Sequence, residues 1–278
     1  MPIAYSAVPG FFLQDHPSAI AAEIGALPDR FGLIDPSTER WDRFKIKIDK
    51  LNAQGVEKGE TYKVFFLGRH GQGWHNVAEA KYGTQAWDDH WSKLNGDDTM
   101  IWGPDPLLAP AGIEQALDAR KAWQKEIPFG IPVPQRHYAS PLKRALDTWK
   151  TIFAEDGARV TILEHCREEY GEHTCDKRST LSHLRDIYPG PTYAFESGFE
   201  EEDPHWSPHE RESKLHIASR ALNVLDLCFS EDVRDTCEQY ISVVAHGGII
   251  NGFLDVAGRP AYPLPTGGIN CHRYSDTP

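Results

Sequence analysis

The stretch FFLGRHGQGWHN, residues 65–76, decides the fold and indicates where the chemistry lies. It continues the run YKVFFL (62–67), whose large apolar residues are typical of a short strand buried on both faces. Arg69 and His70 follow this run at once and lie between glycines. Glycine lets the backbone turn sharply and approach a ligand closely. The stretch therefore predicts a buried strand that ends in a turn carrying a guanidinium group and an imidazole.

Strand-like and helix-like segments alternate along the rest of the chain. Helical spacing of apolar residues predicts helices over 110–127, 141–154 and 212–229, with another helix after His246. Short apolar or β-prone runs predict further strands over 133–140, 159–163, 240–245 and 267–274. This alternation predicts an α/β fold, a three-layer sandwich with a mostly parallel central sheet.

The chain is expected to form a single domain with an N-terminal extension. Residues 1–60 show no sustained apolar period, so we expect an extension packed on the main domain and partly helical near 16–26. The domain itself is predicted over 61–278, with insertions near 72–105 and 165–210.

Both insertions are rich in polar residues. The first is expected to be a long loop with a helical piece around 77–93, and loops of this length are often functional. The second contains the acidic tract EEED (200–203), which we interpret as a solvated loop. His205 and His209 lie near this tract, but their spacing does not favour a metal site.

The overall composition excludes several classes of partner. The 278 residues carry a formal net charge of −12, so the surface as a whole repels polyanions such as nucleic acid. The sequence has no basic tract for a membrane surface and no apolar run of about 18 residues that would span a bilayer. Its five cysteines include no C-x-x-C pair, and the beginning of the chain lacks the pattern of a signal peptide. We therefore expect reduced cysteines, no metal site and a cytoplasmic location.

Three of the predicted strands are followed by residues suited to bind a phosphoryl group. In a parallel sheet the carboxyl ends of the strands meet at one edge, where ligands bind. Arginine offers a planar fork of donors that matches phosphate oxygens, and helix starts after such turns add backbone N–H donors. A neutral histidine can attack phosphorus as a nucleophile. We expect a phosphate site where the following groups converge: Arg69-His70-Gly71, Ser140-Pro141 with Arg144, and His246-Gly247.

These segments resemble the motifs of the histidine phosphatase superfamily, also called phosphoglycerate-mutase-like proteins. The family's first signature is an Arg-His-Gly after the first strand, and Asn76 stands where many members have an asparagine. The segments SPLKRA (140–145) and VVAHGG (243–248) match those that carry the family's second arginine and second histidine. DPLLAPAGIEQA (105–116) resembles another family segment, with Ala109 in place of the usual threonine. Together these segments extend the resemblance over roughly residues 60–273.

The resemblance implies a mechanism that needs no cofactor and no metal. His70 would attack phosphorus in its neutral form and become a phosphohistidine. Arg69, Arg144 and a protonated His246 would hold the three non-bridging oxygens. Asn76 would add a neutral donor. The ligand is then a small phosphorylated substrate or inorganic phosphate.

The resemblance also implies a carboxylic acid that protonates the leaving oxygen. Much of the family has a glutamate four residues before a glycine, but Arg167 stands at that position before Gly171. The run REEYGEHTCDKR (167–178) resembles a fungal and plant branch in which the glutamate directly follows the arginine. We therefore expect Glu168 to be the acid, with Glu169 as the alternative.

Other residues near these motifs are candidates for contacts with the rest of the substrate. His173, Asp176 and Arg178 belong to the branch-specific run; they either bind substrate or hold the insertion through ion pairs, and the sequence leaves both roles open. We expect substrate contacts from Asn76, Gly71, Trp74, His75, His173 and Gly247.

A phosphatase acting on a small phosphorylated metabolite is the function that we expect. A phosphoglycerate-type mutase is the alternative within the fold, but it needs basic residues that recognise a carboxylate substrate, whereas the second insertion is acidic. A third possibility is a repurposed anion pocket that binds, or acts on, a non-phosphorylated metabolite. The sequence identifies neither the substrate nor the oligomeric state.

Overall fold

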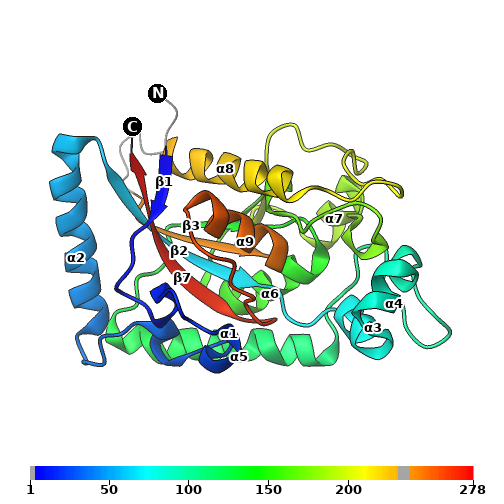
Figure 1. Cartoon of the computed structure of the whole chain (residues 1–278), viewed down its shortest axis with the longest axis horizontal. Helices are drawn as coiled ribbons and strands as arrows, with labels where there is room; N and C mark the ends of the chain where they lie inside the picture. Colours follow the sequence, from blue (N-terminus) through cyan, green and yellow to red (C-terminus); the bar gives the residue numbers. More distant parts are fainter. Residues whose placement is uncertain (1–3, 231–237, 278) are drawn as a thin grey trace.

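The computed structural model describes residues 4–230 and 238–277, and within them seven strands form one sheet. The spatial order is β1-β7-β2-β6-β3-β4-β5 (Figure 1). The strands pair antiparallel on both sides of β7 and parallel from β2 to β5, which confirms the mostly parallel sheet. Their bounds are β1 Ala4–Ala7, β2 Thr61–Arg69, β3 Arg136–Ala139, β4 Val160–Ile162, β5 Tyr193–Phe195, β6 Tyr240–Ala245 and β7 Ile269–Thr277.

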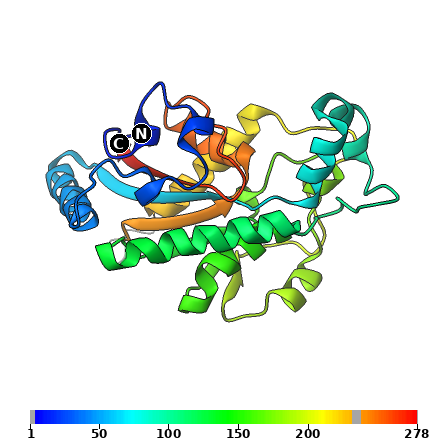
Figure 2. The same cartoon turned by 90° about the horizontal axis from the view of Figure 1, so that it is seen from below.

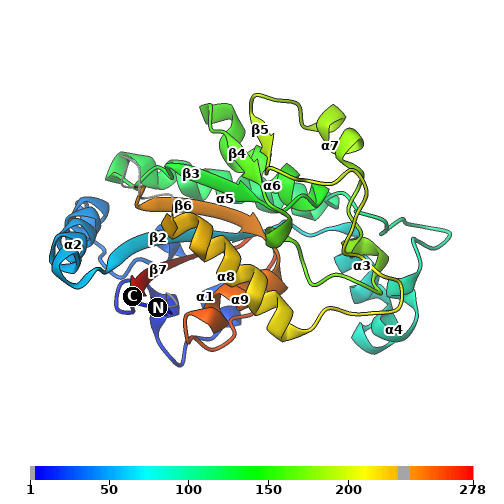
Figure 3. The same ribbon diagram turned by 90° about the horizontal axis from the view of Figure 1, so that it is seen from above.

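Helices cover both faces of the sheet, which confirms the three layers. Figure 1 shows α8 above the strands and α5 below them, and in the view from below α5 lies alongside the strands (Figure 2). Helices α3 and α4 lie at the opposite end of the molecule from α2 (Figures 1 and 3). The bounds are α1 Ala21–Ile24, α2 Arg40–Gly55, α3 Trp74–Tyr82, α4 Thr84–Asp89, α5 Pro110–Glu126, α6 Lys143–Phe153, α7 Leu181–Ile187, α8 Lys214–Ser230 and α9 Gly247–Val256.

The run before the Arg-His-Gly turn is apolar because β2 is buried on both faces. Val64 and Phe66 pack into a core shared with α2, α5 and α6. Phe65 and Leu67 point to the other side and pack into a core shared with α8 and α9. None of these four side chains is more than 2% exposed. The prediction of a strand buried on both faces is confirmed.

The other predicted strands and the long helices of the main domain are confirmed with shifted ends. The last strand begins at Ile269, and α6 begins at Lys143, after Pro141 rather than with it. The helical piece expected around 77–93 is two helices, because Gly83 between α3 and α4 has a φ of 81°. A left-handed φ of this kind ends the first helix.

The first sixty residues contribute more regular structure than the sequence indicates. β1 pairs with β7 at the edge of the sheet, and α2 packs on the core beside β2. The sequence does not predict α2, because its buried stripe has only three large apolar residues, Trp41, Phe44 and Ile48, among many charged ones. The helix expected near 16–26 is a single turn in α1, and β5 and α7 are further elements that the sequence does not predict. The boundary of the extension at residue 60 stays a prediction.

Two expectations from composition can be compared with the structure. Within the described ranges, no helix has both the length and the apolar character needed to cross a membrane. Cys166, Cys175 and Cys271 are buried free thiols, and Cys237 lies outside the described residues.

Candidate active site

The carboxyl ends of three neighbouring strands bring the Arg-His-Gly turn and the second histidine together. β6 lies between β2 and β3, with Arg69 opposite Ala245 in the register. His70 and His246 therefore leave adjacent strands side by side, and their ring centroids lie 4.9 Å apart. Ser140, the first residue after β3, lies with its Oγ 2.7 Å from Nε2 of His246.

His70 is oriented by its own turn. Its Nδ1 lies 2.6 Å from the carbonyl oxygen of Gly71, which can only accept, so Nδ1 carries the proton and Nε2 keeps a free lone pair. Burial, and next the charge of Arg144, lower the pKa of His70 well below its ordinary value of 6.5. The imidazole is therefore neutral, in the form that a nucleophile requires.

The turn after β2 packs closely against the start of α5. The Gly71 N–H donates to Thr148 Oγ1 at 3.0 Å, and the Gln72 N–H donates to the side chain of Gln115 at 2.7 Å. A Cβ on Gly71 would lie 2.2 Å from the carbonyl oxygen of Gly112. A Cβ on Gly112 would lie 2.1 Å from the carbonyl oxygen of Gln72. The segment DPLLAPAGIEQA thus holds the turn, and both glycines are needed for the close approach.

Four buried polar atoms of the residues around His70 have no hydrogen-bond partner within the described part of the chain. Buried polar atoms are nearly always paired, so such a cluster marks a place for a polar ligand. Burial lowers the pKa of His75 and of His246, so both rings are neutral here. The four atoms are Arg69 Nε, Arg144 Nε, His75 Nδ1 and His246 Nδ1.

Both guanidinium groups are fixed in orientation by the protein. Arg144 is fully buried, with Nη1 donating to the carbonyl oxygen of Cys175 at 2.8 Å and Nη2 donating to Asp176 Oδ1 at 2.9 Å. Arg69 donates from Nη1 to the carbonyl oxygen of Leu264 at 2.8 Å. Their Nε atoms remain for a ligand, and guanidinium groups are well suited to the oxygens of a phosphate.

Glu168 lines the same site as Arg69 and His70. Its Oε1 accepts from the N–H of Gly248 at 2.8 Å and from the N–H of Glu169 at 2.9 Å. Burial raises the pKa of Glu168 above its ordinary value of 4.5, which favours the protonated acid. Glu169, in contrast, forms ion pairs with Lys214 and Arg211.

Arg69, His70, His75 and Glu168 line a cavity of about 350 Å³, whereas Arg144 and His246 are not among its lining residues. Two of the predicted substrate contacts lie away from it. Gly71 is in the packed turn behind the cavity, and Trp74 lines a separate hollow and packs on the aromatic core of the first insertion. The predicted substrate contacts that do line the cavity are Asn76, His75, His173 and Gly247.

Several lining residues are not singled out by the sequence. They come from α3, α4, α9, the segment before α8 and its first residue, at positions outside the motifs. The sequence offers one signal for two of them: Arg211 and Lys214 directly follow the second insertion, which is otherwise acidic. These residues are Glu79, Trp87, Asp88, Arg211, Lys214 and Asn251.

A family sequence model and several known proteins match this chain. The model of the histidine phosphatase superfamily (branch 1) matches residues 65–263. The chain belongs to the histidine phosphatase superfamily. A probable phosphoglycerate mutase from Arthroderma benhamiae is 40% identical over 285 residues, with 96% of this chain and 83% of that protein covered. Phosphomutase-like protein 3 of Candida albicans is 33% identical, with 95% and 78% covered.

A more distant relative is named as a phosphatase. Glucosyl-3-phosphoglycerate phosphatase from Mycolicibacterium vanbaalenii is 29% identical over 164 residues, with 57% of this chain and 66% of that protein covered. The fungal relatives, together with relatives from Arabidopsis thaliana named phosphoglycerate mutase-like, confirm the fungal and plant branch.

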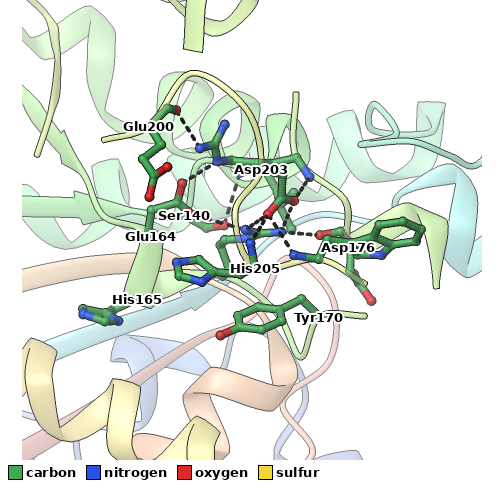
Figure 4. Close-up of polar contacts among 12 residues, drawn as sticks. Ser140, Glu164, His165, Tyr170, Asp176, Glu200, Asp203 and His205 are labelled. Atoms are coloured by element: carbon green, nitrogen blue, oxygen red, sulfur yellow. Dashed lines mark hydrogen bonds and ion pairs between the residues drawn. The ribbon is translucent and has the colours of Figure 1, made fainter. Parts of the chain in front are cut away.

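In this histidine phosphatase family member, a buried ionic network fixes the loop that carries Glu168. Figure 4 shows Asp203 within this network, near Asp176 and Glu164. Arg167 donates to both carboxylate oxygens of Asp203, at 2.8 and 2.6 Å, and to the carbonyl oxygen of Asp176 at 2.8 Å. The residue directly before Glu168 is therefore anchored by a bidentate pair, which has a defined geometry.

The acidic tract EEED takes part in this network and is not simply a solvated loop. The side chain of Asp203 is 1% exposed. Arg178 donates to the backbone carbonyl oxygens of residues 200–202, so that the tract wraps around one guanidinium group. Of the two roles left open for Arg178, the structure shows the one that holds the insertion.

Arg220 of α8 holds the same loop from the other side. Its Nη1 donates to the carbonyl oxygens of His165 and Arg167, each at 2.9 Å. Its Nη2 donates to the carbonyl oxygen of Glu168 at 3.2 Å, and its Nε and Nη2 bind the carboxylate of Glu212. The backbone on both sides of Glu168 is therefore fixed by charged hydrogen bonds.

Replacing Gly248 with alanine is expected to displace Glu168 without unfolding the protein. A Cβ on Gly248 would lie 2.1 Å from Oε1 of Glu168, which is the far end of a flexible side chain, so the carboxyl group moves. Displacements of about 1 Å cost up to about 100-fold in rate, and we expect a loss of that order in kcat with an unchanged melting temperature. Gly247→Ala is the comparison, because its Cβ would make only van der Waals contact with Arg69. Equal losses of kcat in Gly248→Ala and Gly247→Ala would contradict the assignment of Glu168 as the acid.

One group of side chains near the cavity has donor atoms suited to a metal ion. Ligand atoms of His173, Cys175 and Asp176 lie within 4.8 Å of one another. However, the carboxylate of Asp176 already binds Arg144 at 2.9 Å and Arg211 at 3.0 Å. Two cationic groups on the same carboxylate disfavour a metal cation, so we propose no metal site here.

Proposed function

We propose that this chain is a phosphatase that hydrolyses a small phosphomonoester through a phosphohistidine on His70. The observation that carries the proposal is the cluster of unpartnered buried atoms beside the free Nε2 of His70. Two of these atoms belong to guanidinium groups, whose charge suits a phosphoryl dianion. Ser140 Oγ already accepts from the N–H of Leu142, so its hydroxyl can donate to Nε2 of His246 and leave Nδ1–H as a donor to phosphate.

In the first step, Nε2 of His70 forms a bond to phosphorus while the bond from phosphorus to the leaving oxygen breaks. Arg69 and Arg144 stabilise the negative charge on the non-bridging oxygens. Glu168, whose pKa is raised by burial, gives its proton to the leaving oxygen. The carbonyl oxygen of Gly71 holds Nδ1–H and supports the positive charge that develops on the ring.

In the second step, a water molecule attacks phosphorus and the bond from phosphorus to His70 breaks. The carboxylate of Glu168 takes the proton from this water, so the acid of the first step acts as the base of the second. Inorganic phosphate leaves, and both side chains return to their starting protonation states.

A phosphoglycerate-type mutase is the second candidate, and the names of the fungal relatives are the observation in its favour. A mutase returns the phosphoryl group to a carboxylate-bearing substrate instead of to water, and it needs cations to bind that carboxylate. Arg211 and Lys214 are the cations of the outer cavity, and both are engaged by carboxylates of the protein. Phosphatase activity therefore has the stronger support.

Phosphate release from a panel of phosphomonoesters, with a chelator present, tests the proposed function. We expect inorganic phosphate to appear with at least one ester and to be insensitive to the chelator. Positional exchange of the phosphoryl group within phosphoglycerate, without release of phosphate, would favour the mutase. If no ester gives either phosphate release or phosphoryl exchange, both the phosphatase and the mutase are overturned, and a repurposed pocket is favoured.

The activity is expected to have a bell-shaped dependence on pH, set by His70 on the acid side and by Glu168 on the alkaline side. His70 becomes protonated, and stops acting as a nucleophile, only when the pH falls through its lowered pKa. The acid limb of the activity profile therefore lies below pH 6.5. Protonated Glu168 is lost as the pH rises through its raised pKa, which lies above 4.5, so activity falls on the alkaline side. The measurement is kcat/KM against pH for wild type and Glu168→Gln. The variant should lose the alkaline limb, whereas the ionisation of the substrate affects both proteins equally.

A further inference from the structure

The outer wall of the cavity is defined here as five charged lining residues, which come from α3, from α4, from the second insertion and from the residues that follow this insertion. Beyond the phosphate position, these side chains meet the part of the substrate that leaves with the oxygen. The outer wall consists of Glu79, Asp88, Glu169, Arg211 and Lys214.

The two cations of the outer wall are already neutralised by the protein. Arg211 binds Asp176 through Nη1 at 3.0 Å and faces Glu169 from Nε at 3.4 Å. It also donates to the carbonyl oxygen of Gly171 at 2.7 Å. Lys214 forms an ion pair with the other oxygen of Glu169. An anionic group on the substrate would have to displace one of these partners.

Two carboxylates of the outer wall form no ion pair with a lysine or arginine among the described residues, although the charge of Glu79 does act on Arg69. Glu79 accepts from the hydroxyl of Thr84 at 3.0 Å. Asp88 faces Nε2 of His173 at 3.6 Å. Burial lowers the pKa of His173, so its ring is neutral near pH 7 and does not balance the charge of Asp88.

The outer wall is therefore negative where it meets the substrate. It has three carboxylates and two cations, and one of these cations is shared with Asp176. A carboxylate on the leaving group would be repelled, whereas an amine would be attracted.

We infer that the substrate of this site is an amino alcohol phosphate, a phosphomonoester whose leaving group carries a protonated amine and no carboxylate. The inference rests on the proposed phosphatase function and specifies its substrate class. The phosphate end binds at Arg69 and His70, and the amine end lies between Glu79 and Asp88.

Three phosphomonoesters with two-carbon leaving groups test the inference, because they differ mainly in charge. They are phosphoethanolamine, ethylene glycol phosphate and phosphoglycolate, which end in an amine, a hydroxyl group and a carboxylate. We expect kcat/KM to be about tenfold or more higher for the amine than for the carboxylate at low salt. High salt should reduce this ratio, since exposed charges are screened.

Variants separate the effect of the outer wall from the different intrinsic reactivities of the esters. In the double variant Glu79→Gln with Asp88→Asn, we expect the ratio between amine and carboxylate esters to fall severalfold. Asp89→Asn is the matched control, because Asp89 is an exposed carboxylate on the same helix that does not line the cavity. It should leave the ratio unchanged.

The outcomes distinguish this inference from the proposed function. Release of phosphate with a preference for phosphoglycolate, or a ratio that the double variant does not change, would overturn the substrate class and leave the phosphatase proposal standing. No release from the three esters or from p-nitrophenyl phosphate would overturn the proposed function, and the inference with it.

Discussion

Alanine at position 70 is expected to lower phosphate release by at least about 10⁴-fold, because it removes the nucleophile and leaves the phosphate site without its attacking atom. Nε2 of His70 is the atom with a free lone pair, since Nδ1–H is held by the carbonyl oxygen of Gly71. Initial rates of phosphate release with the best ester of the panel give the measurement. Phosphate itself should still bind to His70→Ala, because Arg69 and Arg144 remain.

A matched control is needed because His70 is buried, and its removal also leaves a small cavity. His183→Ala is suitable, since His183 is exposed on α7 and does not line the cavity. The control should keep its rate, and both variants should remain folded by circular dichroism. A rate for His70→Ala within tenfold of wild type would contradict the nucleophile assignment.

Glutamine at position 168 is expected to lower the rate with alkyl phosphates by about 10²- to 10⁴-fold. Glutamine keeps the oxygen that accepts from the N–H of Gly248, so the loop should stay in place while the proton is lost. With p-nitrophenyl phosphate the first step should change little, because the phenolate leaves without protonation. The measurement compares burst and steady-state rates for an alkyl ester and for p-nitrophenyl phosphate.

Glu169→Gln is the matched control for this experiment. Glu169 pairs with Lys214 and Arg211, so its replacement should change the outer cavity but not the transfer of the proton. Equal losses of the burst rate with both esters in Glu168→Gln would indicate a structural role. A larger loss in Glu169→Gln than in Glu168→Gln would reverse the choice between the two glutamates.

The sheet and the inner part of the site could be predicted from the sequence because they rest on short-range patterns. β2 and β6 are buried on both faces and therefore read as apolar runs, and their ends mark where a ligand binds. Arg69, His70 and His246 follow these ends directly, so locating the strands also locates the side chains.

The outer part of the site could not be predicted, because it depends on contacts between distant segments. Lys214 reaches Glu169 across 45 positions, and Glu169 lies in an insertion that has no period to indicate its path. Asp203 lies in a tract that composition marks as exposed, yet it binds Arg167 from 36 positions away. Trp74 shows the opposite case, since its nearness to the motif in sequence does not bring it to the cavity.

Direct detection of a phosphohistidine tests the central claim most directly. The Glu168→Gln variant should accumulate the intermediate, because its formation from p-nitrophenyl phosphate needs no acid, whereas its hydrolysis needs the carboxylate. Rapid quenching in base, followed by mass spectrometry of the intact chain and of its peptides, should find one phosphoryl group on His70 that is lost in acid. Rapid release of p-nitrophenol with no phosphoryl group on the chain, or with the group on another residue, would contradict the account.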